Sequence, residues 1–230
     1  MKEQEFIELR NKVKKCRICE NIFFSPHLEN SDRLVCGKDA PDGLWNNPKD
    51  LDAEYMVIGQ DYGSLETEEF PTDKTLKALF AESKFKIEDV ENSSKVFFTN
   101  IVNCYRCNKS TGEINKGCLS VCAREFMSEL IRIISPRAII VLGKEPFFAM
   151  NFCRDAKIVC TNKSTEKLNN NLSKIMKYEY VLEFDDGLKI PIYPVYHPGA
   201  NGRRTRNEDD QKSDWSKIKE KIEKYHGKEK

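Results

Sequence analysis

Four short apolar runs, set apart by amphipathic segments, constrain the fold of this chain more than any other feature. Each run is about as long as one buried strand, and they lie at residues 55–58, 96–102, 138–142 and 192–199. Segments with an apolar stripe at helical spacing lie at residues 74–85, 119–134, 145–153 and from 214 onward. Buried strands that alternate with helices predict an α/β fold, with a mostly parallel, four-stranded central sheet covered by helices on both faces.

Two stretches fall outside this alternation. Residues 3–15 are predicted as a short amphipathic helix, and the irregular segment that follows it, up to residue 54, as loop. Residues 161–190 are predicted as an insertion that begins with a polar segment and continues as a hairpin around an Asp-Gly turn. No internal repeat is present, so residues 1–230 are predicted to form one domain, with a cysteine-bearing lobe around residues 16–54.

Net charge, apolar run length and the N-terminal residues bear on the partners and the location of the protein. The net charge is +1 at pH 7, which excludes no partner, because a nucleic-acid binder can combine a basic face with an acidic back. No run of about 18 apolar residues occurs, which argues against a membrane span. The start, MKEQEFIELR, has no apolar signal core, so a cytoplasmic protein is predicted. Nothing in the sequence indicates an oligomer, and a monomer is expected.

Nine cysteines are the unusual feature of the composition. Their odd number, without an export signal, argues against a disulfide framework and favours metal ligation. Spacing alone leaves two kinds of metal site open. A zinc ion with four thiolate ligands would use Cys16, Cys19, Cys104 and Cys107. A [4Fe–4S] cluster would use Cys16, Cys19, Cys104 and Cys122.

Polar side chains stand where the predicted strands end. Gln60 and Asp61 follow the first strand, Asn100 lies in the second, and His197 lies near the end of the fourth. Open α/β sheets bind their ligands at the carboxyl ends of the strands, so these side chains are candidates for a common site. Each also has a structural interpretation: Asp61 as a turn residue, Asn100 as a partner of a nearby backbone group, and His197 as an ordinary core or surface histidine.

Four segments in chain order resemble the uracil-DNA glycosylase superfamily, and most closely its iron–sulfur (family 4) branch. Where that branch has a strand ending in G-E-A-P-G, this chain has MVIGQDYG, and where it has T-N-x-V-K-C, this chain has VFFTNIVNC. The branch's helix–strand segment ending in L-G is similar to CAREFMSELIRIISPRAIIVLG, and its P-x-x-H-P motif is similar to PVYHPG. The resemblance implies the three-layer α/β fold of the superfamily and the removal of bases from DNA.

The resemblance also implies a cofactor and roles for the strand-end residues. It selects the [4Fe–4S] cluster over zinc, with a mainly structural role, and leaves Cys107 and Cys118 as extra cysteines. A glycosylase flips a nucleotide out of the stack and breaks its N-glycosidic bond, so that the sugar gains positive charge and the base gains negative charge. Asp61 would direct the water and stabilise the sugar, and His197 would donate a hydrogen bond to the base anion. Gln60 and Asn100 would contact the base edge, and an aromatic ring would stack on the base at Phe70.

The chain departs from the motifs of the superfamily at three places. Gln60-Asp61 replaces Glu-Ala and is similar to the G-Q-D-P-Y-H motif of another branch, in which the Asp directs water. Gly63 stands at or near the Tyr of that motif, which blocks the 5-methyl group of thymine, so the resemblance implies room beside C5 of the base. The loop after the histidine lacks the expected apolar wedge. Three arginines there suit DNA phosphates or the minor groove, namely Arg203, Arg204 and Arg206.

Three functions are compatible with these features. The first is a monofunctional DNA glycosylase that removes uracil in base excision repair and leaves an abasic site; no lysine is placed for a Schiff base, so strand nicking is not expected. The second is the same chemistry on a modified or 5-substituted pyrimidine, in repair or in defence against foreign DNA. The third is a non-catalytic iron–sulfur or zinc module that binds nucleic acid. The expected partner is DNA that contains uracil or a modified base.

Overall fold

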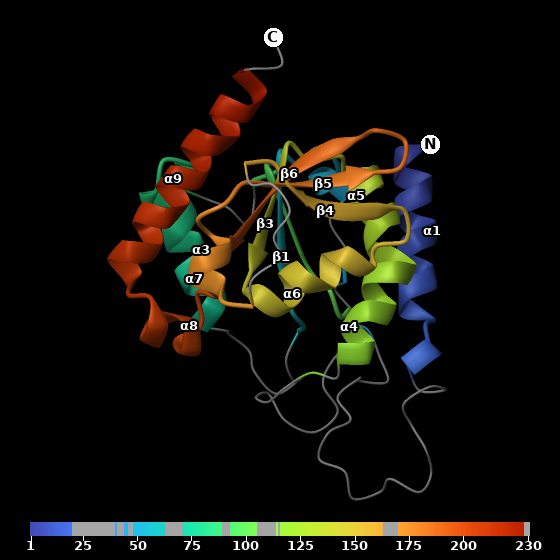
Figure 1. The fold of residues 1–230 in the computed structure, drawn as a ribbon. Helices are drawn as coiled ribbons and strands as arrows, with labels where there is room; N and C mark the ends of the chain where they lie inside the picture. The colour runs from blue at the N-terminus through green and yellow to red at the C-terminus, as the bar shows by residue number, and fades with distance from the viewer. Residues whose placement is uncertain are drawn as a thin grey trace, which may run out of the picture.

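A six-stranded mixed sheet forms the centre of the computed structural model, which describes residues 1–19, 40, 44–45, 48–62, 71–88, 93–104, 114, 116–162 and 170–227 (Figure 1). The strands are β1 (Tyr55–Gly59), β2 (Val96–Asn100), β3 (Ala138–Leu142), β4 (Ala156–Cys160), β5 (Tyr180–Phe184) and β6 (Lys189–Val195). Their order across the sheet is β2-β1-β3-β6-β5-β4. Neighbours run parallel from β2 to β6, and β5 and β4 continue the sheet in antiparallel pairing.

The sheet therefore has six strands rather than the four predicted. The sequence did not indicate β4, because its side chains are only half-buried or exposed and form no continuous apolar run. The first arm of the predicted hairpin contains β5, which pairs with β6 and so extends the central sheet. Tyr180, Leu182 and Phe184 of β5 are buried in the same apolar cluster as part of the parallel strands, which explains why this arm joins the sheet.

Helices cover both faces of the sheet and make three layers, as the α/β prediction requires (Figure 1). The α-helices are α1 (Lys2–Lys14), α3 (Pro71–Glu82), α4 (Lys116–Cys122), α5 (Ser128–Ile134), α6 (Lys144–Ala149), α7 (Leu172–Ile175), α8 (Ala200–Thr205) and α9 (Glu208–Gly227). Shorter turns are η1 (Pro48–Asp52), η2 (Ala123–Met127) and η3 (Met150–Phe152). In Figure 1, α1, α4 and α5 lie on one side of the sheet, and α3 and α9 lie on the other.

Strand β1 shows how the two faces are divided. All five of its residues are buried, as expected of a strand with helices on both sides. Met56 and Ile58 belong to the apolar cluster that includes Phe6 of α1, whereas Tyr55 and Val57 belong to a second cluster with residues of α3 and α9. This alternation follows from the two-residue period of a strand. It places the end of β1, where the polar residues begin, between two packed layers.

The predicted helix at residues 119–134 is a continuous helical stretch with a π-helical turn inside it. Helix α4 ends at Cys122, the π turn η2 follows at once, and α5 continues to Ile134. The stretch stops at Ser135, whose φ of 53° is left-handed, directly before Pro136. This agrees with the rule that the residue before a proline disfavours the helical conformation. Single π turns in helices are frequent at functional sites, and this one adjoins a predicted metal ligand.

The C-terminal helix is longer than predicted. α9 begins at Glu208 and not at 214, because Asn207 accepts a hydrogen bond from the Asp210 N–H at 2.8 Å and acts as its cap. Its first turn is acidic, which complements the positive end of the helix dipole. Part of the predicted arginine loop before it is the short helix α8.

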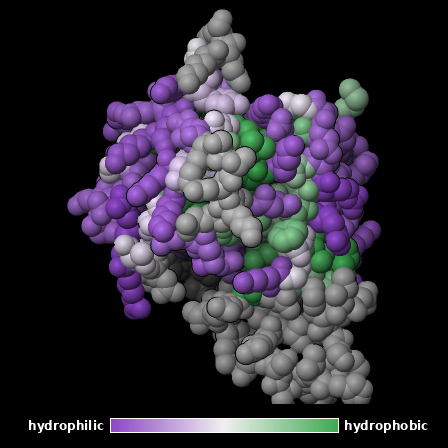
Figure 2. Space-filling view, in the orientation of Figure 1, coloured by the Kyte–Doolittle hydropathy of each residue, from purple (hydrophilic) through white to green (hydrophobic). Residues whose placement is uncertain are grey.

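Charged side chains cover much of the described surface. The left of Figure 2, where α9 lies in Figure 1, is hydrophilic, and its helix carries lysines and glutamates outside its buried stripe. Among the described residues, no helix is long and apolar enough to cross a membrane.

Candidate active site at the carboxyl ends of the parallel strands

The parallel strands bring the predicted polar residues to one edge of the sheet. In the register of β1 and β2, Gly59 lies beside Asn100, so Gln60 and Asp61 emerge next to it. Across β3, Leu142 lies beside Val195, and His197 follows two residues later. Three separate segments of the chain thus contribute to a common edge, as predicted from the strand ends.

Gln60 and Asp61 form the turn that leaves β1. The Gln60 carbonyl accepts a hydrogen bond from the Val102 N–H at 3.0 Å, which ties this turn to the segment after β2. The Gln60 side chain donates to Asp61 Oδ2 at 3.3 Å, and both side chains remain partly exposed. The negative charge of Asp61 raises the pKa of His197, so the two groups lie within electrostatic reach. This edge of the sheet therefore carries both a carboxylate and an imidazole.

His197 is held as a neutral hydrogen-bond donor. Its Nδ1 accepts a hydrogen bond from the Gly199 N–H at 3.0 Å, so in the neutral ring the proton resides on Nε2. Burial lowers the pKa of His197 below the ordinary value, and the charge of Asp61 offsets this only in part. The imidazole is therefore uncharged at neutral pH and presents an Nε2–H, which suits it to stabilise a developing anion.

Asn100 is half-buried at the end of β2 and keeps its amide for a ligand. Its backbone carbonyl accepts from Thr99 Oγ1 at 3.4 Å. Within the described part of the chain, the side-chain amide makes no hydrogen bond, so the alternative role of satisfying a nearby backbone group is not observed. An amide offers both a donor and an acceptor, the pair needed to read a carbonyl and an adjacent N–H on a pyrimidine.

Glycines around His197 are the contribution that sequence reasoning missed. A Cβ on Gly199 would lie 2.9 Å from His197 Nδ1 and 3.0 Å from Thr72 Oγ1, and one on Gly202 would lie 1.7 Å from the His197 carbonyl oxygen. The first turn of α3, with Thr72, and the start of α8 thus pack closely around the histidine. The signal was present in HPGANG, where two glycines follow the histidine within five residues.

Two predicted base contacts cannot be placed. Phe70, expected to stack on the base, and Gly63, expected to leave room beside C5, lie outside the described residues. Both roles stay predictions.

The three arginines after the histidine have different surroundings. Arg206 donates from Nε and Nη2 to the Asp214 carboxylate at 2.9 and 2.8 Å, and its carbonyl accepts from Gln211 at 2.9 Å. It therefore fastens the end of α8 to α9. Arg203 and Arg204 are exposed on α8 and make no ion pair with any described residue, so they remain available for DNA phosphates.

The four cysteines that the resemblance selects are linked by effects on one another's pKa values. Cys16 and Cys19 follow α1, Cys104 follows β2, and Cys122 ends α4. The thiols of Cys19 and Cys122 are hydrogen-bonded, which raises the pKa of Cys122 well above its ordinary value and lowers that of Cys19. Cys104 also raises the pKa of Cys122, and Cys19 adds to the rise that burial causes at Cys16.

These four residues are thiols that form no disulfide, whereas Cys118 is disulfide-bonded. Cys107, the alternative zinc ligand, lies outside the described residues. In the described ranges, no group of three or more His, Cys, Asp or Glu side chains is arranged so that it could hold a metal ion. The cluster and the zinc site both stay predictions.

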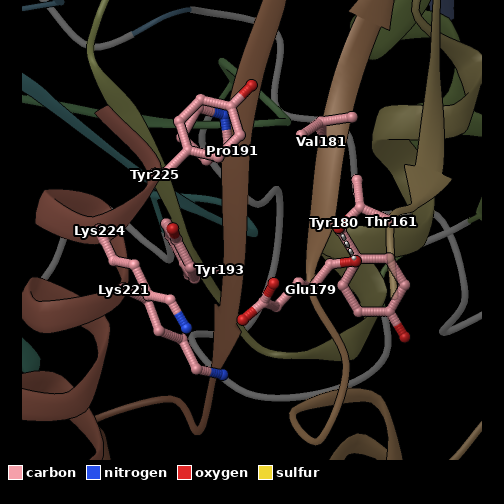
Figure 3. A pocket seen from close by; sticks show the side chains of 9 residues that line it. All are labelled: Thr161, Glu179, Tyr180, Val181, Pro191, Tyr193, Lys221, Lys224 and Tyr225. Atoms are coloured by element: carbon pink, nitrogen blue, oxygen red, sulfur yellow. Dashed lines mark hydrogen bonds between the residues drawn. The ribbon is translucent and has the colours of Figure 1, made fainter. Parts of the chain in front are cut away.

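A small pocket lies away from the strand-end edge. It is lined by β5, β6, α9 and the residues beside β4 and β5, with Glu179, Tyr193, Lys221 and Lys224 among its polar groups (Figure 3). None of its nine lining residues is a predicted site residue. The pocket and the candidate active site are separate features.

Comparison with known proteins identifies the family. A model of the uracil DNA glycosylase superfamily matches residues 48–220, about three quarters of the chain. The match includes Asp61, Asn100 and His197, and it begins after Cys16 and Cys19. A search of curated proteins found no match. With its α/β sheet and its polar strand ends, the chain belongs to the uracil-DNA glycosylase superfamily.

Proposed function

We propose that this protein is a monofunctional DNA glycosylase that hydrolyses the N-glycosidic bond of uracil in base excision repair. The observation that carries the proposal is the state of His197, a neutral ring with its proton on Nε2. It lies at the same sheet edge as Asp61 and Asn100. The Asn100 side-chain amide forms no hydrogen bond with a described residue. A histidine with both ring nitrogens engaged by the protein would have no N–H to offer to a leaving base.

Recognition of the base rests on Asn100. A flipped uracil presents a carbonyl at C4 and an N–H at N3, and one amide can pair with both. Cytosine presents a donor and an acceptor in these positions instead, so the amide orientation that pairs with uracil does not pair with cytosine. Because a buried edge left unpaired is costly, a site built to make these hydrogen bonds rejects the wrong base strongly.

Asp61 and His197 have different roles in cleavage of the bond. The bond from the base nitrogen N1 to C1′ breaks with its electron pair going to the base, and the sugar becomes cation-like. Asp61 stabilises the sugar and orients a water whose oxygen bonds to C1′, and the water's proton passes to the carboxylate and on to solvent. The Nε2–H of His197 donates to O2 of the uracil anion, which leaves without prior protonation.

We further propose that Cys16, Cys19, Cys104 and Cys122 hold a [4Fe–4S] cluster. The mutual effects on their pKa values support a common site, and four thiolates are the usual ligands of such a cluster. These four thiolates would hold the cluster, which would act as a structural cross-link between the segments that carry them. Bound there, the group would tie the exits of α1 and β2 to the end of α4.

The cofactor proposal is tested by metal analysis of Cys122→Ser beside Cys160→Ser. We expect the first variant to lose iron, sulfide and the broad absorption near ~400 nm, and to melt at a lower temperature. Cys160 forms no disulfide and lies outside the set of four, so its variant should resemble the wild type. One zinc ion per chain in the wild type, with no iron, would contradict the cluster.

The activity is tested with duplexes that differ only in one base. We expect rapid release of uracil, slower or no release of bulkier 5-substituted pyrimidines, and an intact, alkali-labile abasic strand without nicking. His197→Ala should lose most of this activity, whereas His226→Ala, at a histidine on α9 that contacts the Arg137 carbonyl, should not. If the protein releases 5-substituted pyrimidines in preference to uracil, these bases and not uracil are its substrates. If it binds DNA but releases no base, it is a binding module.

A further inference from the structure

We propose that Gly59 is a positioning residue for Asn100: the missing side chain at the end of β1 gives the Asn100 amide the space from which it reads the base. The inference rests on the proposed function, because it takes Asn100 as the reader of the base edge. It assigns a specificity role to a residue that touches neither the sugar nor the leaving base.

Of the side chains that the structure describes, only that of Asn100 restricts the space around Gly59. A Cβ on Gly59 would lie 2.2 Å from Asn100 Oδ1 and 3.3 Å from Asn100 Cγ. The next atom, the Thr99 carbonyl oxygen, is 3.9 Å away, an ordinary contact. The amide of Asn100 therefore occupies the volume that any side chain at position 59 would fill, and nothing else competes for it among the described neighbours.

Backbone conformation does not explain the glycine. Gly143 and Gly187 have φ values of 106° and 92°, which favour glycine, whereas Gly59 has no positive φ and lies in a regular strand. A residue with a side chain could adopt the backbone of Gly59 without strain. Space, and not conformation, is thus what the glycine provides.

The surrounding backbone cannot move aside. Gly59 and Asn100 are register partners, and the Gly59 carbonyl accepts from the Ile101 N–H at 2.9 Å. Thr99, just before Asn100, is fixed by a buried hydrogen bond from Trp45 Nε1 at 3.0 Å. The amide, in contrast, is the end of a rotatable side chain with no hydrogen bond to the described residues.

A methyl group at position 59 would therefore be relieved by displacing the amide and not by unfolding the sheet. The amide must retreat by about 1 Å to restore normal contact, and a displacement of that size in a catalytic site can cost about 100-fold in rate. Discrimination against cytosine should fall as well, because the donor and acceptor no longer meet the base edge. Stability should change little, since the strand and its packing are kept.

The test is a double-mutant cycle of Gly59→Ala and Asn100→Ala, with uracil release from one duplex and melting temperature as readouts. We expect Gly59→Ala to lose about 100-fold in kcat/KM and to melt close to the wild type. Added to Asn100→Ala, it should cause no further loss, because the atom it displaces is gone. Gly227→Ala is the matched control: this glycine is exposed, an added Cβ would have no described atom within 4 Å, and the variant should behave as the wild type.

Full activity of Gly59→Ala, or a loss that multiplies with that of Asn100→Ala, would overturn the inference. Crystal structures of the wild type and Gly59→Ala give a readout that does not need turnover. A displaced amide in a protein inactive on every base would support the positioning role while removing the proposed function. An amide that stays in place would overturn the positioning role whatever the activity.

Discussion

Two regions of the sheet differ in how their polar side chains are paired. One is the β4–β5 extension, and the other is the strand-end edge, which carries Gln60, Asp61, Asn100 and His197. In the extension, Arg132 donates to Asp155 at 2.9 and 2.7 Å and to Asp186 at 2.5 Å, and its guanidinium lies 4.5 Å from the Phe184 ring centre. At the strand-end edge, the Asn100 amide makes no hydrogen bond with the described chain.

This difference separates residues that maintain the fold from residues that await a ligand. Arg132 joins α5 to the turns beside β4 and β5, and its charge is matched by two carboxylates. A site that must bind a base leaves some polar groups, here the Asn100 amide, without a partner in the described chain, because their hydrogen bonds are made with the substrate. Substitutions in the first region should thus change stability, and those in the second should change activity.

The largest effect is expected at Asp61. Asp61→Asn keeps the shape of the side chain but removes the charge that orients water and stabilises the sugar, so uracil release should fall by about 10³-fold. The melting temperature should stay near that of the wild type. Single-turnover release, compared with Asp209→Asn on the exposed start of α9, measures this. A variant that retains full activity would remove Asp61 from the mechanism.

His197 should affect both activity and its dependence on pH. Loss of the Nε2–H in His197→Ala should cost about 10²–10³-fold in rate. The pKa of His197 is lowered in the folded state, so below about pH 6.5 the unfolded state binds the proton more readily. The stability that His197 contributes is therefore present above this value and is lost as the pH falls through the folded pKa.

Melting curves between pH 5 and 8 test the sign of this effect. The wild type should lose stability on acidification more steeply than His197→Gln, which has no titrating group at this position. Identical slopes in the wild type and His197→Gln would contradict a histidine that is held neutral.

Arg132 tests the other region. Arg132→Met removes three hydrogen bonds and leaves Asp155 without its partner, so the melting temperature should drop by several degrees, at about 2–4 °C per kcal/mol for a chain of this size. Uracil release at 25 °C should be unchanged. A stable Arg132→Met protein with poor activity would break the division between the two regions.

The smallest effect is expected at the exposed arginines. Arg203→Gln combined with Arg204→Gln should weaken DNA binding several-fold and lower the salt dependence of binding, by about one unit of slope for each lost phosphate contact. Arg206→Gln should instead lower the melting temperature, because Arg206 is paired with Asp214. Titrations at several salt concentrations distinguish these cases, and an unchanged slope in the double variant would remove α8 from the DNA interface.

The sequence predicted the layers of this fold because buried parallel strands are apolar throughout, as in β1 and β3. It missed β4, whose side chains are only partly buried, and it placed the start of α9 at the first apolar residues instead of at the Asn207 cap. Partial burial and side-chain caps leave a weak periodic signal, which explains both errors.

For the candidate site, the sequence indicated which residues stand at strand ends, since each follows an apolar run. It could not indicate that Arg206 is paired with Asp214, because that contact depends on the angle between two helices. Nor could it reveal that the Asn100 amide lies over Gly59, which only the register of β1 and β2 determines. Spacing identifies candidate residues, but contacts between elements determine which of them are free to act.

The most direct test of the central claim is the release of free uracil from a duplex oligonucleotide, measured by mass spectrometry under single-turnover conditions. The wild type is compared with the double variant Asp61→Asn, His197→Ala. Glycosylase chemistry at the strand-end edge predicts free uracil and an intact abasic strand from the wild type, and neither from the double variant, which should still bind DNA. Equal uracil release by both proteins would contradict the assignment of the active site to this edge of the sheet.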